Sequence, residues 1–185
     1  MLLPGLFTLF SCTGCDNEVN PGNEKPLVDI TTVCRSVQEM GGYATFYKPQ
    51  AGYVGDPMPY YNEADNLFYV FFLQDWRNGE PTDHPVYFTK TSDYSTFQGF
   101  TEAIPNESAD SQEQFLGTGS FIKDENGKMY GFYTGHNRNL YPAEKIMLAT
   151  STDMRTFTKV PGFTFEAPDG YDKNNFRDPD VYYDQ

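Results

Sequence analysis

The fold is indicated by the stretch VYFTKTSDYSTF, residues 86–97, which returns further along the chain as IMLATSTDMRTF, residues 146–157. A second pair, LFYVFF at residues 67–72 and KMYGFY at residues 128–133, has nearly the same spacing. Self-similarity at one fixed period is typical of repeated supersecondary units. The sequence therefore predicts structural units of about 61 residues each.

The same period relates two aspartates. Asp56 begins the stretch DPMPYY, Asp178 begins the stretch DPDVYY, and the two lie two periods apart. A lone Asp-Pro step is an ordinary turn dipeptide. Two copies in repeat register are expected at equivalent places in two units, which lets their carboxylates converge on one site.

The composition favours β-structure, because 17% of the residues are aromatic and tyrosine and phenylalanine are enriched in strands. Eight short runs separated by Asn, Asp and Gly turns read as strands: 43–47, 59–61, 67–73, 86–91, 120–123, 129–134, 146–150 and 181–183. At most one or two short helical turns are expected after residue 30.

Three or four antiparallel strands in about 61 residues is the size of a β-propeller blade. A closed ring needs at least about four blades. The chain is therefore predicted to be all-β and to hold about two blades and the opening strand of a third. A two-sheet sandwich is the alternative, but it gives no reason for the repeat register.

The N-terminus reads as a targeting segment, residues 1–26, ahead of a propeller domain at residues 27–185. Its apolar run, residues 2–10, is too short to span a bilayer and ends in SCTGC. Such an ending resembles a bacterial lipoprotein signal, with Cys12 favoured for lipidation and Cys15 as the alternative. No Lys or Arg precedes the run, which departs from that pattern.

The expected location is the cell envelope, in the periplasm or on the outer membrane, with a lipid anchor as the only membrane contact. A cytosolic protein with an apolar N-terminal strand remains the alternative.

The charge and the cysteines exclude several function classes. A net charge of −13 argues against nucleic-acid binding, which needs a basic footprint, and suits a neutral polyhydroxylated ligand. Only Cys34 remains in the body of the chain, where it is expected to be a small buried apolar residue. Neither a disulfide framework nor a Cys/His metal site is expected, and no metal or other cofactor is predicted.

The motif FRDPDV at residues 176–181 resembles a hallmark of family 32 glycoside hydrolases, the β-fructosidases (invertases, levanases and inulinases). Further segments occur in the family's order: GDP at 55–57, FFLQ at 71–74, LGTGS at 116–120 and YTG at 133–135. The resemblance runs from about Tyr43 to the C-terminus. It implies a five-bladed propeller with its active site at the axis, acting on fructans or sucrose.

The resemblance also implies the catalytic roles. In a retaining mechanism one ionised carboxylate attacks the anomeric carbon and a protonated acid serves the leaving oxygen. Asp56 takes the place of the nucleophile, and Asp178 would stay charged and hold sugar hydroxyls. The adjacent Arg177 is expected to lie partly buried beside Asp178 and to keep it ionised. Both carboxylates should face one cavity.

Other residues would contact the sugar. Gln74 and Ser120 are expected as hydrogen-bond partners at the same cavity, and Trp76 could pack on the apolar face of the ring. His84 and His136 are more simply interpreted as exposed loop histidines than as site residues. The Ser/Thr-Asp steps at Asp93 and Asp153 are predicted to anchor equivalent turns and to have no catalytic role.

Two departures from the family bear on activity. Gly55 and Met58-Pro59 replace the residues that flank the family's nucleophile, so its hydrogen-bonding shell should differ. The family's general acid is a glutamate beyond the Arg-Asp-Pro step, and no glutamate follows Asp178 in this sequence. The chain as given is therefore expected to be inactive by itself. The alternatives are a non-catalytic carbohydrate-binding propeller and an inverting arabinanase or xylosidase type of enzyme on the same fold.

Overall fold

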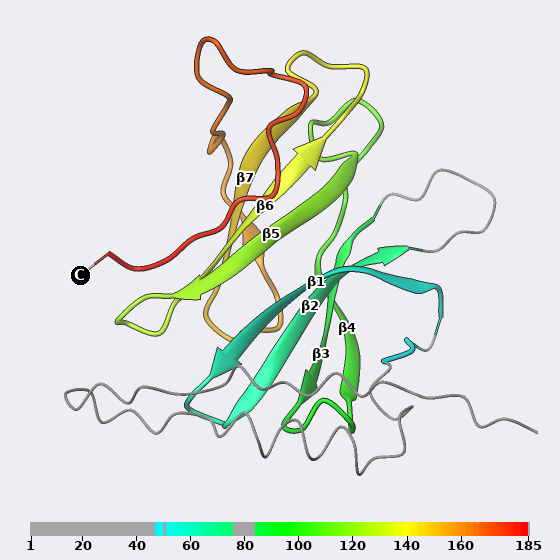
Figure 1. The fold of residues 1–185 in the computed structure, drawn as a ribbon, viewed down its shortest axis with the longest axis vertical. Coiled ribbons are helices and arrows are strands. Elements are labelled where there is room, and N and C mark those ends of the chain that lie inside the picture. The colour runs from blue at the N-terminus through cyan, green and yellow to red at the C-terminus, as the bar shows by residue number, and fades with distance from the viewer. Residues whose placement is uncertain (1–46, 50, 76–83, 185) are drawn as a thin grey trace, which may run out of the picture. The chain divides into compact units, whose positions relative to one another are not determined.

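The computed structural model describes residues 47–49, 51–75 and 84–184. These residues form eight strands in two four-stranded antiparallel sheets, and they include no helix that could cross a bilayer (Figure 1). The all-β prediction is confirmed. The targeting segment with Cys12 and Cys15, and also Cys34 and Trp76, lie outside the described residues, so the lipid anchor stays a prediction.

Each sheet is a meander in which consecutive strands pair. The first, blade 1, contains β1 (Tyr53–Asn62), β2 (Leu67–Asp75), β3 (Val86–Thr91) and β4 (Gln98–Ile104). The second, blade 2, contains β5 (Phe115–Lys123), β6 (Met129–His136), β7 (Glu144–Ser151) and β8 (Thr158–Lys159). The strands predicted at 67–73, 86–91, 129–134 and 146–150 fall within β2, β3, β6 and β7, where aromatic and branched residues pack on the pleated surface.

The repeated stretches occupy the same place in their sheets, from the third strand into the turn after it. Asp93 Oδ1 accepts hydrogen bonds from the backbone amides two and three residues ahead, at 2.9 and 2.8 Å. Asp153 Oδ1 accepts the equivalent pair at 2.8 and 2.9 Å. The next residue is left-handed in both turns, Tyr94 with φ 54° and Met154 with φ 58°. The predicted turn anchors are confirmed.

Two strands were missed and one predicted strand is wrong. β4 contains Gly99 and is exposed over its first half, so it lacks an apolar pattern, and β8 is very short. Residues 181–183 do not form a strand in the structure. Of the strand predicted at 43–47, only Tyr47 is described, and it lies outside any strand.

Aromatic rings from both blades form the core that joins them. Phe71 of β2 stacks on Phe121 of β5 with the ring centroids 3.7 Å apart and the planes 12° from parallel. Phe157, after the blade 2 turn, meets both rings edge-on at 5.7 and 5.4 Å. All three side chains are buried. This contact fixes β5 beside blade 1 and so positions the ends of β1 and β5 relative to each other.

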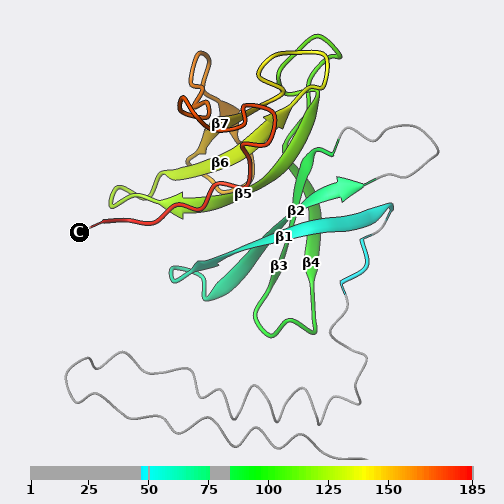
Figure 2. The ribbon, with the colours of Figure 1, turned by 45° about the horizontal axis from the view of Figure 1, so that its top comes forward.

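The first strands of the two blades lie next to each other, joined by residues one period apart (Figure 2). The backbone amide of Gly119 donates to the sulfur of buried Met58 at 3.1 Å. At the other end of the strands, Lys123 Nζ donates to Asn62 Oδ1 at 2.7 Å. Both pairs are 61 residues apart in the sequence, so the repeat period is also the spacing between neighbouring blades.

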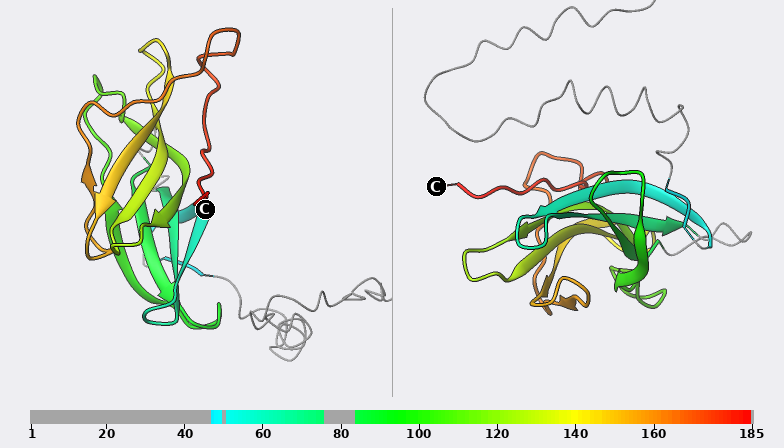
Figure 3. Two further views of the ribbon diagram at one scale, coloured as in Figure 1. Left: turned by 90° about the vertical axis from the view of Figure 1, so that its left-hand side faces the viewer. Right: turned by 90° about the horizontal axis from the view of Figure 1, so that it is seen from below.

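The C-terminal segment continues this spacing beyond blade 2. The Ser120 hydroxyl accepts a hydrogen bond from the amide of Val181, 61 residues ahead, and donates to the carbonyl of Pro179, each at 3.0 Å. Figure 3 shows the segment running along blade 2 as a single extended stretch of chain. Residues 178–181 thus begin a third repeat beside β5, although they form no ladder with it.

Candidate active site

Asp56 is placed by a β-bulge in the first strand of blade 1. The register of β1 against β2 shifts between Gly55 and Met58, and Asp56 there has φ 41°. An extra residue in one strand bends it and redirects side chains at the rim of a sheet. A left-handed non-glycine residue is uncommon, and aspartate is one of the few that tolerate it. The bulge directs Asp56 out of the ladder and toward the neighbouring blade.

Blade 2 has a bulge at the equivalent place, and it presents Thr118 instead of a carboxylate. The register of β5 against β6 shifts between Gly117 and Gly119. Only glycine fits at position 119, because a Cβ there would lie 1.9 Å from the carbonyl oxygen of Phe132. The Thr118 hydroxyl donates to Asp56 Oδ2 at 2.6 Å, so the two bulges meet across the blades.

Asp178 is held over the same bulge by its backbone. Its φ is 60°, and its amide donates to Thr134 Oγ1 at 3.0 Å. The Thr134 hydroxyl in turn donates to the carbonyl of Thr118 at 3.1 Å. The two aspartates related by the repeat are thus both left-handed, and both depend on Thr118 or its partner for their position.

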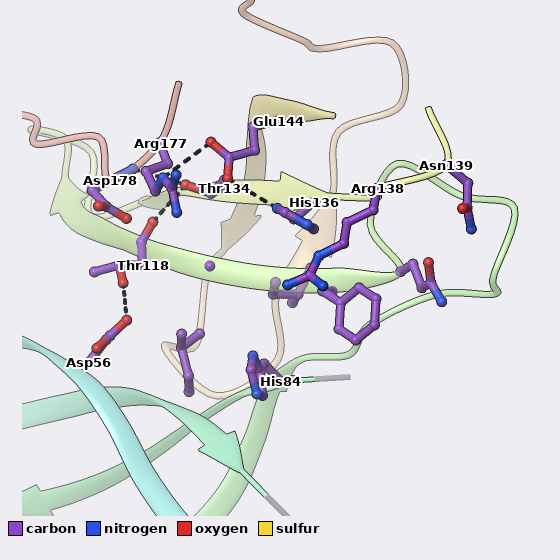
Figure 4. A pocket seen from close by; sticks show the side chains of 15 residues that line it. Asp56, His84, Thr118, Thr134, His136, Arg138, Asn139, Glu144, Arg177 and Asp178 are labelled. Carbon is purple, nitrogen blue, oxygen red and sulfur yellow. Dashed lines mark hydrogen bonds and ion pairs between the residues drawn. The ribbon is translucent and has the colours of Figure 1, made fainter. Parts of the chain in front are cut away.

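A cavity of about 720 Å³ opens between the two blades at this point. Asp56, Thr118 and Asp178 line it, as Figure 4 shows. The structure therefore places both predicted catalytic aspartates at one cavity. It also adds Thr118 and Thr134, which the sequence motifs contained but to which no role was given.

The electrostatics around Asp178 differ from what the sequence led us to expect. Burial raises the pKa of its carboxyl above the ordinary value of 3.8, and the charges of Asp56 and Glu144 add to the rise. Arg177 and the Thr118 hydroxyl lower the pKa without cancelling these effects. Asp178 as a whole residue is exposed, so water screens part of each interaction. Arg177 thus favours the ionised carboxylate of Asp178, as expected, but its effect is smaller than the combined effect of burial and the neighbouring carboxylates.

Arg177 pairs with a different carboxylate, Glu144. The Nε atom of Arg177 lies 3.2 Å from Glu144 Oε2, an ion pair that lacks hydrogen-bond geometry. The other oxygen, Oε1, lies 3.1 Å from His136 Nδ1. The side chain of Glu144 is 2% exposed and that of Arg177 is 48% exposed, so Arg177 is less buried than predicted. A buried carboxylate needs such partners to remain charged.

Two predicted sugar-binding residues, Gln74 and Ser120, lie away from the cavity. Gln74 is fully buried and donates from Nε2 to the carbonyl of Ala51 at 2.7 Å. It packs so closely on Gly52 that a Cβ there would lie 2.2 Å from Nε2. Ser120 is engaged with the backbone of the C-terminal segment. Neither side chain lines the cavity, and Trp76 is outside the described residues.

Both histidines line the cavity, contrary to the simpler interpretation as exposed loop residues. His136 is the last residue of β6, and His84 lies just before β3 with φ 41°. Sequence reasoning missed Glu144 altogether, although a signal existed. Glu144 stands one repeat period after His84, and each residue lies at the start of the third strand of its blade.

A metal centre does not emerge from these side chains. Within residues 47–49, 51–75 and 84–184, no three His, Cys, Asp or Glu residues are grouped as metal ligands. The described residues that line the cavity carry carboxylates, hydroxyls, imidazoles, guanidinium groups and the amides of Gln114 and Asn139.

Two carboxylates at one cavity of a β-propeller are an arrangement used by glycoside hydrolases. The sequence profile described as "Glycosyl hydrolases family 32 N-terminal domain" matches residues 46–185, and the chain belongs to this family. A search of curated protein sequences gave no significant match.

Solved structures of the same fold include three from this group of enzymes. Fructofuranosidase from Schwanniomyces occidentalis, complexed with fructose, has a TM-score of 0.59 at 21% identity, over 75% of this chain and 29% of its own. A mutant β-fructofuranosidase of Bombyx mori in complex with sucrose has a TM-score of 0.59 at 19% identity, over 83% and 35%. Fructan 1-exohydrolase IIa from Cichorium intybus has a TM-score of 0.57 at 19% identity, over 71% and 25%. The chain thus spans about a third or less of the length of these proteins.

Proposed function

We propose that this chain carries the nucleophile side of a β-fructosidase active site, with Asp56 as nucleophile and Asp178 as stabiliser of the transition state. The observation that carries the proposal is the meeting of Asp56, Thr118 and Asp178 at one cavity between two blades. Membership of family 32 and the fructose and sucrose complexes of similar folds support a fructofuranosyl substrate, in sucrose or a fructan.

The hydrogen bond from Thr118 gives the two carboxylate oxygens of Asp56 different roles. Oδ2 is held at 2.6 Å, which leaves Oδ1 to attack the anomeric carbon. As the new C–O bond to Asp56 forms, the bond to the leaving oxygen breaks, and that oxygen takes up a proton from a general acid. Water then cleaves the fructosyl ester and restores the carboxylate.

Asp178 would act when positive charge develops on the sugar ring. An oxocarbenium-like ring beside it favours the ionised carboxylate, against the burial that raises its pKa in the empty site. Its attraction therefore grows from ground state to transition state, which is the condition for a contribution to rate.

The general acid is not supplied by the third carboxylate of the cavity. Glu144 has one oxygen facing His136 and the other facing Arg177, and its side chain is almost completely buried. Both of its oxygens are therefore engaged by neighbouring side chains, and neither is presented to a leaving oxygen beside Asp56.

The experiment uses a substrate that needs no acid. An aryl β-fructofuranoside with a good leaving group is incubated with the chain, and the fructosyl adduct is sought by intact-mass measurement and peptide mapping. We expect the adduct on Asp56, and none in Asp56→Asn, which retains the shape and the left-handed backbone.

Binding measured in parallel separates the two main alternatives. Fructose should shift the NMR signals of residues around Thr118 and Asp178 in both the wild type and Asp56→Asn. Sugar binding without any adduct would identify a non-catalytic carbohydrate-binding propeller. An adduct on a residue other than Asp56 would remove the nucleophile assignment.

A further inference from the structure

The two proposed catalytic carboxylates of the cavity and its Arg138 guanidinium lie on different sides. Asp56 and Asp178 lie toward one side in Figure 4, whereas Arg138 reaches over the other side, with His84 and His136 between them. The chain as a whole has a net charge of −13, with 26 acidic residues against 13 Lys and Arg. Among the described residues, this end of the cavity has one arginine and two imidazoles, and the carboxylate nearest to them, Glu144, is already paired. Such an end is unusual for this molecule.

Glu144 does not neutralise that end. Its Oε1 faces His136 Nδ1 at 3.1 Å and its Oε2 faces Arg177 Nε at 3.2 Å. Because a carboxylate only accepts hydrogen bonds, we assign the Nδ1 proton of His136 to this contact, which leaves Nε2 facing away from Glu144. The charge of Glu144 is thus matched by Arg177, and no residue in the described part of the chain supplies a counter-charge to Arg138.

Arg138 has no hydrogen bond or ion pair within the part of the chain that the structure describes. It also borders a second, smaller recess of about 480 Å³, which it shares with His136, Glu144 and Arg177. Glu144 is again the only carboxylate among the described residues that line this recess. A guanidinium offers five donors and no acceptor, and it recognises planar or tetrahedral oxyanions through two of them at once.

An aromatic surface lies beside these donors. The ring of Phe115 lines the cavity, and both imidazoles meet it edge-on, His84 at 6.4 Å and His136 at 6.1 Å between centroids. Phe115 is half-buried, so part of the ring remains open to the cavity. Aromatic faces pack against the C–H face of a sugar ring, while polar groups around them fix its orientation.

We propose that the Arg138 end of the cavity binds an oxyanion, such as a carboxylate, carried by the part of the saccharide that leaves when Asp56 attacks. The ring bearing the oxyanion lies on Phe115. The oxyanion proposal rests on the proposed function, because that function defines where the reacting ring lies. The two ends then match the reacting ligand, positive at the ring beside Asp56 and Asp178 and negative at the far end.

The test compares glucuronate with glucose, which differ in one carboxylate, by NMR titration of the chain at low salt. Glucuronate should bind about fivefold more tightly, the scale of an exposed ion pair, and should shift signals of Phe115 and Arg138. The preference should disappear in Arg138→Ala and persist in Arg155→Ala, an exposed arginine on the blade 2 turn away from the cavity. It should also weaken as salt is raised.

Four outcomes decide the proposal. Equal binding of glucose and glucuronate overturns it and makes the far end a neutral subsite, and so does a preference that survives Arg138→Ala. Inorganic phosphate that binds at Arg138 while glucuronate does not also overturns it, because the anion is then not borne by a sugar. If glucuronate binds as expected but fructose does not bind near Asp178, the oxyanion site stands and the proposed function falls.

Discussion

The two blades are nearly identical at their turn ends and different at their cavity ends. At the turn after the third strand, Asp93 and Asp153 make the same backbone hydrogen bonds, each at 2.8 or 2.9 Å. At the bulge of the first strand, blade 1 presents Asp56, whereas blade 2 has Gly117 at the equivalent position and presents the next residue, Thr118. At the start of the third strand, His84 in blade 1 is replaced by Glu144 in blade 2.

This difference shows that the residues that support the fold and the residues that line the cavity occupy different parts of each blade. The turn residues satisfy backbone amides that every copy of the hairpin must satisfy, so both copies keep them. The side chains of Asp56 and Thr118 meet each other across the two blades, so they do not serve their own sheets and are free to differ. Because neighbouring blades place these positions at one cavity, the divergence of two repeats produces a site with several kinds of side chain.

The largest expected effect is a difference in stability between alanine variants at the equivalent positions His84 and Glu144. Glu144→Ala removes the partner of both His136 and Arg177 from a buried position, and the free energy of unfolding should fall by about 2 kcal/mol. His84→Ala removes a half-buried ring with no comparable charge contact and should cost less than about 1 kcal/mol. Urea denaturation measures both values.

A conservative variant checks the physical reason for this difference. Glu144→Gln keeps the volume and an acceptor for His136 but loses the charge opposite Arg177, so its loss should lie between the other two. If His84→Ala and Glu144→Ala cost the same, the pairing of Glu144 contributes no more than ordinary packing, and the two positions are energetically equivalent after all.

A smaller expected effect, on the melting temperature, tests whether the two turns are energetically equivalent. Asp93→Ala and Asp153→Ala should each lower the melting temperature at pH 7 by about 4 °C, because two backbone amides lose their acceptor. Those amides hold the pKa of both carboxyls below 3.8. The stability contributed is therefore present above pH 3.8 and lost as the pH falls through the lowered pKa, so the wild type and variants should converge in acid. Clearly unequal losses at pH 7 would show that the turns are alike in geometry only.

The sequence predicted the scaffold better than the site, for reasons visible in particular residues. The long strands β2, β3, β6 and β7 were predictable because aromatic runs recur at one period. The edge strand β4, with Gly99 and an exposed first half, has no such signal. Residues 181–183 look like a strand locally, but the amide of Val181 donates to the Ser120 side chain and not to the backbone of a neighbouring strand.

The repeat predicted which aspartates share a cavity, whereas the local motifs predicted Gln74 and Ser120 at that cavity, which they do not line. The period related Asp56 to Asp178, and the same arithmetic applied to His84 would have found Glu144. Gln74 and Ser120 were assigned from short segments, and short segments do not show whether a polar side chain faces a ligand or its own backbone. Phe115 belongs to no motif. Arg138 stands one period after Arg77 in the sequence, but it belongs to none of the motifs from which site residues were assigned, so its place at the cavity was not predicted.

The smallest expected effect concerns Asp178, the first residue of the third repeat. Its folded pKa is raised above 3.8, first by burial and then by the charges of Asp56 and Glu144. A raised pKa contributes stability below pH 3.8 that is lost as the pH rises through the folded pKa, so at neutral pH the wild type bears the cost of the ionised group. Asp178→Asn should therefore raise the melting temperature by about 2 °C at pH 7, a value kept small by solvent screening, and should have no effect below pH 3.8.

The control is Asp180→Asn, which removes the same charge two positions away in the same segment and should leave the melting temperature unchanged, because Asp180 does not line the cavity. If both variants stabilise the chain equally, the gain comes from the overall net charge of −13 and not from the cavity. If Asp178→Asn alone stabilises it and also loses fructose binding, the carboxylate is retained at a cost to folding because the ligand needs it. Asp178 would then differ from the turn aspartates Asp93 and Asp153, which do not oppose folding at neutral pH.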